Sequence, residues 1–267
     1  MTPRRPFHAI VGTLFPEMFP GPLGRSLLGT ALNDGIWTLK TLDFRDFSTD
    51  KHRSVDAPPA GGGPGLVMRP DIAAGAIDKA QADAEVLVGS PIGRTRWPVI
   101  YLSPRGAPFT QARARELAAG DGVTLLCGRF EGIDERALEA RGVEEICVGD
   151  AVYTGGEIPA MAVLDAVLRL LPGVLGDPES LEEESFAAGL LEHPQYTRPA
   201  EWEGRAIPEV LLSGHHANVN AWRRARSEAL TKERRPDLWK AHLSRQDDGQ
   251  APAEQSDADK TKQDDAS

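Results

Sequence analysis

The chain has 267 residues, of which 40% are hydrophobic and 26% are charged, with 40 Asp and Glu against 30 Lys and Arg. This length can bury a hydrophobic core in one large domain or two smaller ones, and the composition is typical of a soluble globular protein. No stretch approaches the roughly 18 apolar residues of a membrane-spanning helix, and two cysteines are too few for a disulfide framework. We therefore expect a cytoplasmic protein with buried thiols and no membrane partner.

Strand-like and helix-like stretches alternate over the first 175 residues. The apolar runs that predict strands are residues 7–11, 37–42, 97–102, 123–127 and 145–148. The runs with helical spacing are residues 23–33, 71–84, 111–119, 135–141 and 159–171. This alternation predicts an α/β fold with a largely parallel sheet, in which ligands bind at the carboxyl ends of the strands.

The rest of the chain differs in composition. Glycine, proline and acidic residues over 173–184 predict a linker, and helical patterns follow at 217–234 and 236–243. We expect a main domain over 1–175, an acidic linker over 176–188, a helical domain over 189–245 and a disordered acidic tail over 246–267.

Charge is unevenly distributed along the chain. The formal net charge of −10 disfavours a nucleic-acid partner, but residues 222–245 contain eight Lys and Arg against three Asp and Glu. Such a segment can form a basic surface that binds phosphates, or it can be an ordinary solvated helix face. Charge alone leaves both interpretations open.

The common nucleotide-binding motifs are missing. The sequence has no G-x-G-x-x-G after the first predicted strand and no G-x-x-x-x-G-K-[ST]. A glycine-rich run at 61–65 carries no lysine, and it is either a flexible surface loop or a backbone segment that closely approaches a ligand or partner.

Three predicted strands end in loops that contain glycines, over residues 101–106, 125–136 and 148–160. Because the carboxyl ends of parallel strands meet at one edge of a sheet, we expect these loops to lie together. Glycines allow the backbone to contact a flat ligand such as adenine without interference from side chains. The three loops together predict a ligand site.

Several runs in these loops and beyond resemble one known family. They are HRSVDAPPAGGGPGLVM from residue 52, CGRFEGIDER from 127, VGDAVYTGGEIPAM from 148, DAVLRLLPGVLG from 165, LLEHPQYTRP from 190 and VLLSGHHANVNAWR from 210. These runs closely resemble bacterial TrmD enzymes, which are tRNA (guanine-N1)-methyltransferases of the SPOUT superfamily. The resemblance extends from about residue 7 to residue 245 and excludes the acidic tail.

The resemblance implies a SPOUT-type parallel sheet with a deep C-terminal trefoil knot and a small α-helical C-terminal domain. It also implies a homodimer with active sites at the interface, S-adenosylmethionine (SAM) bound in the knot as methyl donor, and methylation of N1 of guanosine 37, directly 3′ of the anticodon in tRNA. The residues that the resemblance assigns to SAM binding are Leu102, Ser103, Pro104, Gly106, Gly128, Val148, Gly149, Asp150, Ala151, Val152, Tyr153, Gly155, Gly156 and Pro159.

The catalytic residues follow from the same resemblance. Removal of the guanine N1 proton requires a base, and the family uses an aspartate before a Ser-Phe pair, where this chain has Glu184. Glu183 is the alternative base. Arg169 matches an arginine that stabilises negative charge on O6, although a cation near a helix end is common for structural reasons. Glu131 matches a glutamate that positions guanine, or it caps the following helix.

The C-terminal region supplies the residues expected to hold tRNA: His193, Tyr196, Arg198, Ser213, His215, Asn218, Arg223 and Arg224. The pair His215-His216 has no third ligand at metal-binding spacing, so we expect no structural metal. Magnesium assists the family, but the sequence shows no dedicated set of ligands for it.

Two positions depart from the family pattern around SAM: Ala151 stands for a tyrosine and Arg105 for a glutamine. Two other functions stay open at this point. One is a knotted methyltransferase that acts on another RNA position or on ribose. The other is a non-catalytic RNA-binding protein of the same fold, which lost its base when aspartate became Glu184.

Overall fold

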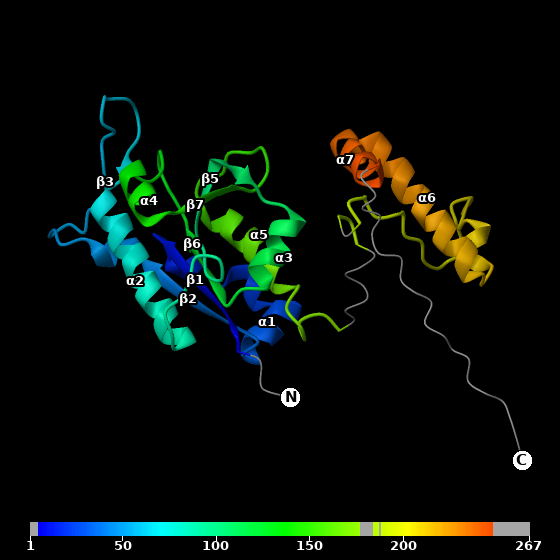
Figure 1. Cartoon of the computed structure of the whole chain (residues 1–267), viewed down its shortest axis with the longest axis horizontal. Helices are drawn as coiled ribbons and strands as arrows, with labels where there is room; N and C mark the ends of the chain where they lie inside the picture. The colour runs from blue at the N-terminus through cyan, green and yellow to red at the C-terminus, as the bar shows by residue number, and fades with distance from the viewer. Residues whose placement is uncertain (1–4, 177–183, 187, 248–267) are drawn as a thin grey trace, which may run out of the picture. The chain divides into compact units, whose positions relative to one another are not determined.

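The computed structural model describes residues 5–176, 184–186 and 188–247 of the chain (Figure 1). The chain divides into two compact units, Met1–Gly176 and Asp177–Ser267, which are described separately below. Glu183 and almost all of the acidic tail predicted over 246–267 lie outside the described residues.

The first unit contains a five-stranded parallel sheet with the strand order β2-β1-β6-β5-β7. Its strands are β1 (Phe7–Thr13), β2 (Trp37–Asp43), β5 (Val99–Pro108), β6 (Gly122–Leu126) and β7 (Glu144–Cys147). Each corresponds to a predicted strand, so the predicted α/β class and parallel sheet are confirmed. The strands are rich in β-branched and other apolar residues because helices cover both faces of the sheet.

Helices cover the two faces of the sheet (Figure 1). One face carries α1 (Ser26–Asn33), α3 (Gln111–Ala118) and α5 (Glu157–Leu168), and the other carries α2 (Pro70–Val88) and α4 (Glu135–Arg141). All of them agree with predicted helices, with differences at their ends. The helix predicted from residue 23 begins only at Ser26, because a 3-10 turn over Gly21–Gly24 precedes it. The helix α2 extends to Val88, where Gly89 ends it in the left-handed conformation.

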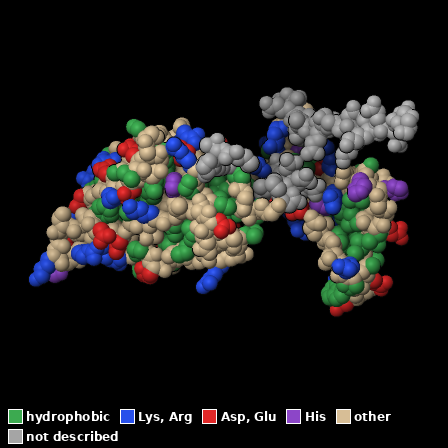
Figure 2. Space-filling view, turned by 90° about the horizontal axis from the view of Figure 1, so that it is seen from below, with side chains coloured by type: hydrophobic (Ala, Val, Ile, Leu, Met, Phe, Trp, Pro, Cys, Tyr) green, Lys and Arg blue, Asp and Glu red, His purple; other side chains and the backbone are tan. Residues whose placement is uncertain are grey.

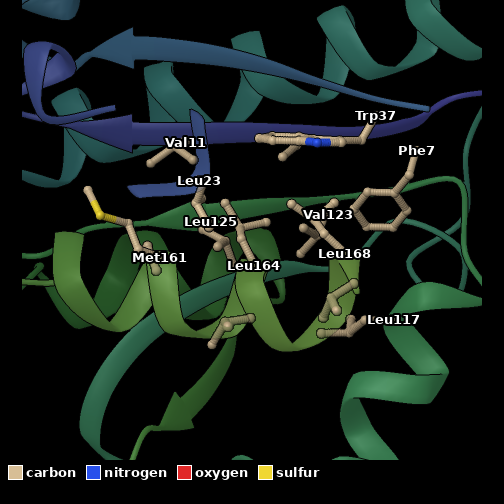
Figure 3. Packing of buried hydrophobic residues seen from close by; sticks show 14 of the residues in the cluster. Phe7, Val11, Leu23, Trp37, Leu117, Val123, Leu125, Met161, Leu164 and Leu168 are labelled. Carbon is tan, nitrogen blue, oxygen red and sulfur yellow. The ribbon is translucent and has the colours of Figure 1, made fainter. Parts of the chain in front are cut away.

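Helix α5 packs directly against the centre of the sheet. Its Leu164 and Leu168 point toward Val123 and Leu125 of β6, and all four side chains are buried (Figure 3). Burial of each such side chain contributes about 1.5–3 kcal/mol to stability. This packing fixes the start of α5, and therefore the loop before it, at the carboxyl edge of the sheet.

Two short antiparallel ladders have no counterpart among the predicted strands. In the first unit β3 (Asp56–Ala57) pairs with β4 (Val67–Met68), and in the second β8 (Glu201–Trp202) pairs with β9 (Arg205–Ala206). The turn of the second hairpin has positive φ at both central residues, Glu203 and Gly204. Strands of two residues have no measurable hydrophobic periodicity, so sequence patterns miss them.

The second unit is mainly helical. It contains α6 (His216–Arg234) and α7 (Pro236–Asp247), which confirm the two helices predicted there. The buried Thr231 hydroxyl of α6 donates to the Ser227 carbonyl at 2.7 Å and accepts from the Leu191 amide at 2.8 Å, which ties the preceding segment to the helix. None of the helices in the described part of the chain has the length and apolar character needed to cross a membrane.

Candidate functional site

The first unit contains a cavity of about 1010 Å³ at the carboxyl ends of β5, β6 and β7. All three predicted loops contribute to its lining, although the first of them, predicted to follow a strand, lies within β5, which continues to Pro108. Of the fourteen residues predicted for the methyl donor, all line this cavity except Gly106, Gly149 and Asp150. Glu131 lines it as well, whereas Arg169 does not.

The first wall of the cavity is an outward loop within β5. Leu102 and Ala107 both pair with Ile146 of β7, so residues 103–106 leave the ladder and return to the same place. A Cβ on Gly106 would lie 2.6 Å from the Ile146 carbonyl carbon, closer than real Cβ contacts. The lack of a side chain at Gly106 therefore lets β5 pair with β7 again at Ala107. Gly106 determines the shape of this wall without lining the cavity itself.

The second wall is the loop after β6, which packs on Tyr101. A Cβ on Gly128 would lie 2.6 Å from the Tyr101 ring, and one on Gly132 would lie 2.9 Å from its hydroxyl. Burial raises the pKa of Tyr101, so this hydroxyl stays neutral at physiological pH. Helix α4 is capped by Asp134, whose carboxylate accepts from the Arg136 amide at 3.0 Å. Glu131 is thus not the cap, and its side chain is exposed at the cavity.

The glycine-rich run approaches this loop from the other side. Gly65 has φ +86° and a Cβ there would overlap the Glu131 side chain, while the Glu131 amide donates to the Leu66 carbonyl at 2.9 Å. Gly61, Gly62 and Gly63 have open space around them. The run is therefore a surface loop at its start and a close backbone approach to a cavity residue at its end.

The third wall is the loop before α5. The Gly156 amide donates to the Gly128 carbonyl at 3.0 Å, and a Cβ on Gly156 would lie 2.6 Å from Cys127 Cα. The second and third loops are thus in direct backbone contact. Cys127 is fully buried, which raises the pKa of its thiol well above the usual value and keeps it protonated.

Two features of this cavity go beyond the sequence predictions. Residues 57–60 and 67–71 line it, because the Met68 amide donates to the Gly132 carbonyl at 2.9 Å. Arg129 also lines it, and its place between Gly128 and Glu131 is a signal that sequence reasoning could have used. Arg105, which the sequence predicts to lie near the methyl donor, also lines the cavity; it is 61% exposed and forms ion pairs with Glu135 and Glu145 at 2.8 and 3.1 Å.

The residues predicted for catalysis lie in different places. Arg169 is the C-cap of α5, and it is half-buried. Glu184 is half-buried in the second unit, where it lines a cavity of about 250 Å³ together with His193, Arg223 and Arg224. The ring nitrogens of His193 and the guanidinium groups of Arg223 and Arg224 give this smaller cavity cationic and hydrogen-bonding groups, and Glu192 adds a second carboxylate to its lining.

Most of the residues predicted to hold tRNA are exposed. They are Tyr196, Arg198, Ser213, His215, Asn218 and Arg224. Arg223 is half-buried, and His193 is only 7% exposed, with its ring 6.4 Å from the Trp222 ring in an edge contact. Figure 2 shows hydrophobic side chains together with histidines on one face of this unit. Within residues 5–176, 184–186 and 188–247, no three His, Cys, Asp or Glu side chains are grouped as a metal site.

Comparisons with known proteins show which family the sequence matches. A family profile described as "tRNA (Guanine-1)-methyltransferase TrmD" matches residues 8–241. A Cereibacter sphaeroides protein named tRNA (guanine-N(1)-)-methyltransferase is 60% identical over 89% of this chain and 93% of its own length. A Ruegeria pomeroyi protein of the same name is 57% identical over 93% of this chain and 100% of its own. A third, from Roseobacter denitrificans, is 61% identical over 88% of this chain and 94% of its own.

Proposed function

The chain belongs to the TrmD family of tRNA (guanine-1)-methyltransferases, and from this premise we propose that it transfers the methyl group of SAM to N1 of guanosine 37 in tRNA. One observation carries the proposal: three glycine-bearing loops enclose a cavity of about 1010 Å³ at the carboxyl edge of a parallel sheet. Neither a knotted enzyme for another RNA position nor a non-catalytic binding protein is favoured, because the relatives named above carry the guanine-N1 name.

The cavity has the properties that SAM requires. Its volume reaches the upper end of the range for small-molecule sites, which suits a nucleoside joined to an amino acid. Gly128, Gly155 and Gly156 present backbone to it, and the apolar side chains of Leu102 and Pro159 are also part of its lining. Backbone groups can hydrogen-bond an adenine edge, while the apolar side chains cover its faces.

When bound, SAM supplies an electrophilic methyl group on a positively charged sulfur. The chain must supply the acid–base chemistry, since guanine N1 holds its proton at neutral pH and must lose it as the methyl arrives. We propose that the Glu184 carboxylate accepts this proton, with Glu183 as the alternative base. Glutamate retains the carboxylate of the family's aspartate and adds one methylene, so the backbone that carries it must adjust by about one bond length.

Two further residues complete the proposed chemistry. Arg169 stabilises the negative charge that develops on guanine O6 as N1 loses its proton, because a fixed cation favours that charge. Glu131, exposed at the donor cavity, positions the guanine. The exposure of the Glu131 carboxylate supports this role, since Asp134 rather than Glu131 caps the neighbouring helix.

The helical unit is proposed to hold tRNA. Exposed arginines of α6 suit phosphates, and exposed Tyr196 and His215 suit stacking on unpaired bases. This basic helix accounts for nucleic-acid binding by a chain of net charge −10. We assign the methyl donor to residues 1–175 and tRNA binding to 189–245, with 176–188 as the linker that carries the base.

The assembly follows from the family. We propose a cytoplasmic homodimer whose subunits each contain a trefoil knot in the SAM-binding part of the chain. Val152 and Ile158, which are 87% and 54% exposed in the loop before α5 and in its first turn, are apolar side chains that an interface between subunits would cover. Magnesium is expected to assist turnover.

Methyl transfer to defined tRNAs tests the proposal. Purified protein, labelled SAM and tRNA transcripts with G or A at position 37 should give transfer only with G37. Glu184→Gln removes the charge at nearly constant size, so it should abolish turnover and leave SAM affinity near that of the wild type. Glu184→Asp is the matched control: it keeps a carboxylate but shortens its reach by one methylene, so it should lower turnover without abolishing it.

Three outcomes would change the assignment. Transfer that ignores position 37 would contradict the proposed target. SAM binding without transfer to any tRNA would favour the non-catalytic alternative. Activity that survives Glu184→Gln would move the base, and Glu183→Gln would then be the next variant to measure.

A further inference from the structure

A buried ion pair lies beneath the third wall of the donor cavity. Glu157, the first residue of α5, is 1% exposed, and its Oε2 lies 2.8 Å from Nη2 of Arg129, which is 20% exposed. The other carboxylate oxygen, Oε1, accepts from the Thr13 hydroxyl at 2.8 Å. The carboxylate of Glu157 therefore joins the end of β1, the loop after β6 and the start of α5.

Arg129 extends this connection to the cavity wall. Its Nη1 donates to the Thr154 carbonyl at 3.2 Å, and its guanidinium carbon lies 4.4 Å from the centre of the Phe15 ring. A Cβ on Gly155 would lie 2.6 Å from Arg129 Cδ, so the backbone of this loop rests directly on the arginine side chain. Arg129 and Gly155 line the cavity, and Glu157 does not.

A gain in the free energy of unfolding does not explain why two charged side chains are paired at this buried place. Removing two charges from water costs free energy that their attraction only partly returns, and apolar side chains of the same size would often stabilise the fold as well or better. A carboxylate at the first turn of a helix gains some stabilisation from the helix dipole, yet that gain does not require burial. The pair does set the orientation of the Arg129 side chain. With one end of the guanidinium held beside the Glu157 carboxylate, Nη1 can donate to the Thr154 carbonyl from one direction only.

We propose that Arg129 and Glu157 are positioning residues for methyl transfer: their buried pair holds the loop 154–156 in the shape that binds the methyl donor. The inference rests on the proposed function, since it takes SAM as the occupant of the cavity. Glu157 is the informative member, because its effect on SAM must pass through Arg129 and the loop.

Three variants test the pair. Glu157→Gln keeps an oxygen for the Thr13 hydroxyl and removes the charge, Arg129→Met removes the guanidinium, and the double variant leaves no unpaired buried charge. We expect each single variant to lower SAM affinity by about 10- to 100-fold, as misplacements of about 1 Å do, and to lower the melting temperature. The double variant should regain melting temperature but not SAM affinity. In steady state, KM for SAM should rise while KM for tRNA stays unchanged.

The control is Asp83→Asn, which removes a largely buried carboxylate paired with Lys40 and Lys79, outside the cavity lining. It should lower the melting temperature and leave SAM affinity unchanged. Arg129→Lys keeps a charge beside Glu157, but its single nitrogen cannot lie at the Glu157 carboxylate and also take the place of Nη1 at the Thr154 carbonyl, so it should fold and lose SAM affinity by several-fold.

The results separate the inference from the proposed function. If the wild type fails to bind SAM in calorimetry, the proposed function fails. If the wild type binds and either Glu157→Gln or Arg129→Lys binds equally well, the positioning role is wrong. Recovery of both melting temperature and SAM affinity in the double variant would also overturn it, because the pair would then act through stability alone.

Discussion

A single methyl group at Gly156 should distort the donor cavity. In Gly156→Ala the new Cβ would lie 2.6 Å from Cys127 Cα and 3.0 Å from the Gly128 amide nitrogen. Ordinary contact begins at 3.4 Å, so the loop must retreat by about 0.8 Å, the difference between the two distances. Both opposing atoms belong to backbone at the end of a buried strand, so the loop before α5 has to move. The φ of Gly156, −78°, is one that alanine adopts, which leaves crowding as the cause.

The expected magnitudes follow from this displacement. Overpacking of a close-packed site costs about 1–3 kcal/mol. For a chain of this size each kcal/mol lowers the melting temperature by about 2–4 °C, so we expect a decrease of about 2–12 °C. The hydrogen bond from the Gly156 amide to the Gly128 carbonyl, 3.0 Å long, should lengthen as well. A cavity wall displaced by nearly 1 Å should bind SAM about 10- to 100-fold more weakly.

Calorimetric titration with SAM and a thermal melt measure the two effects separately. Gly93→Ala is the matched control, because its new Cβ would meet only the Thr95 hydroxyl at 3.8 Å, and it should leave both quantities unchanged. A Gly156→Ala protein that binds SAM with wild-type affinity would refute the reasoning, even if its melting temperature fell, because the loop would then not shape the donor site.

Three further predictions concern charged groups. Arg224→Gln should weaken tRNA binding for all sequences alike and reduce the slope of log affinity against log salt by about one, as measured by filter binding at several salt concentrations. Arg105→Gln, which restores the family residue, should cost at most about 1 kcal/mol in urea unfolding, because its ion pairs with Glu135 and Glu145 are partly exposed; SAM affinity should stay the same. Burial lowers the pKa of His8 from its usual 6.5. As the pH falls, the unfolded chain therefore binds a proton at this histidine before the folded chain does. The free energy of unfolding should not depend on His8 above pH 6.5 and should decrease below it. Urea unfolding at pH 7.5 and pH 5 should show this decline in the wild type, and less of it in His8→Phe.

Most of the fold could be predicted because its elements are long and regular. The strands of the sheet and the helices have four residues or more and stand out as apolar or periodic runs, and their alternation specifies a parallel sheet. The same reasoning brings the three loops to one edge, and the cavity is found there. The ends of helices are harder to predict, because they depend on local features such as the 3-10 turn over Gly21–Gly24 and the left-handed Gly89.

The details of the site depend on contacts between distant residues, which no local pattern reveals. The outward loop of β5 exists because Leu102 and Ala107 pair with the same residue of β7. The segment 67–71 reaches the cavity through the hydrogen bond of Met68 to Gly132, and Arg129 meets Glu157 from 28 positions away along the chain. In the sequence, Glu157 falls within the loop predicted over 148–160, two residues before the predicted helix, and no local pattern indicates that its side chain is buried.

The departures from the family pattern fall where this architecture tolerates them. Backbone and glycines determine the shape of the donor cavity, so an exposed Ala151 in place of tyrosine changes the lining and leaves the hydrogen-bonding frame intact. The Arg105 guanidinium is engaged by Glu135 and Glu145, which balances its charge at the cavity. The change at Glu184 is of another kind, because a proton acceptor works through its side chain and must reach a defined atom. Because glutamate is also a carboxylate, the change from aspartate keeps the proton acceptor and alters only its distance from the backbone. We therefore expect the backbone around Glu184 to differ in position from that of relatives with aspartate.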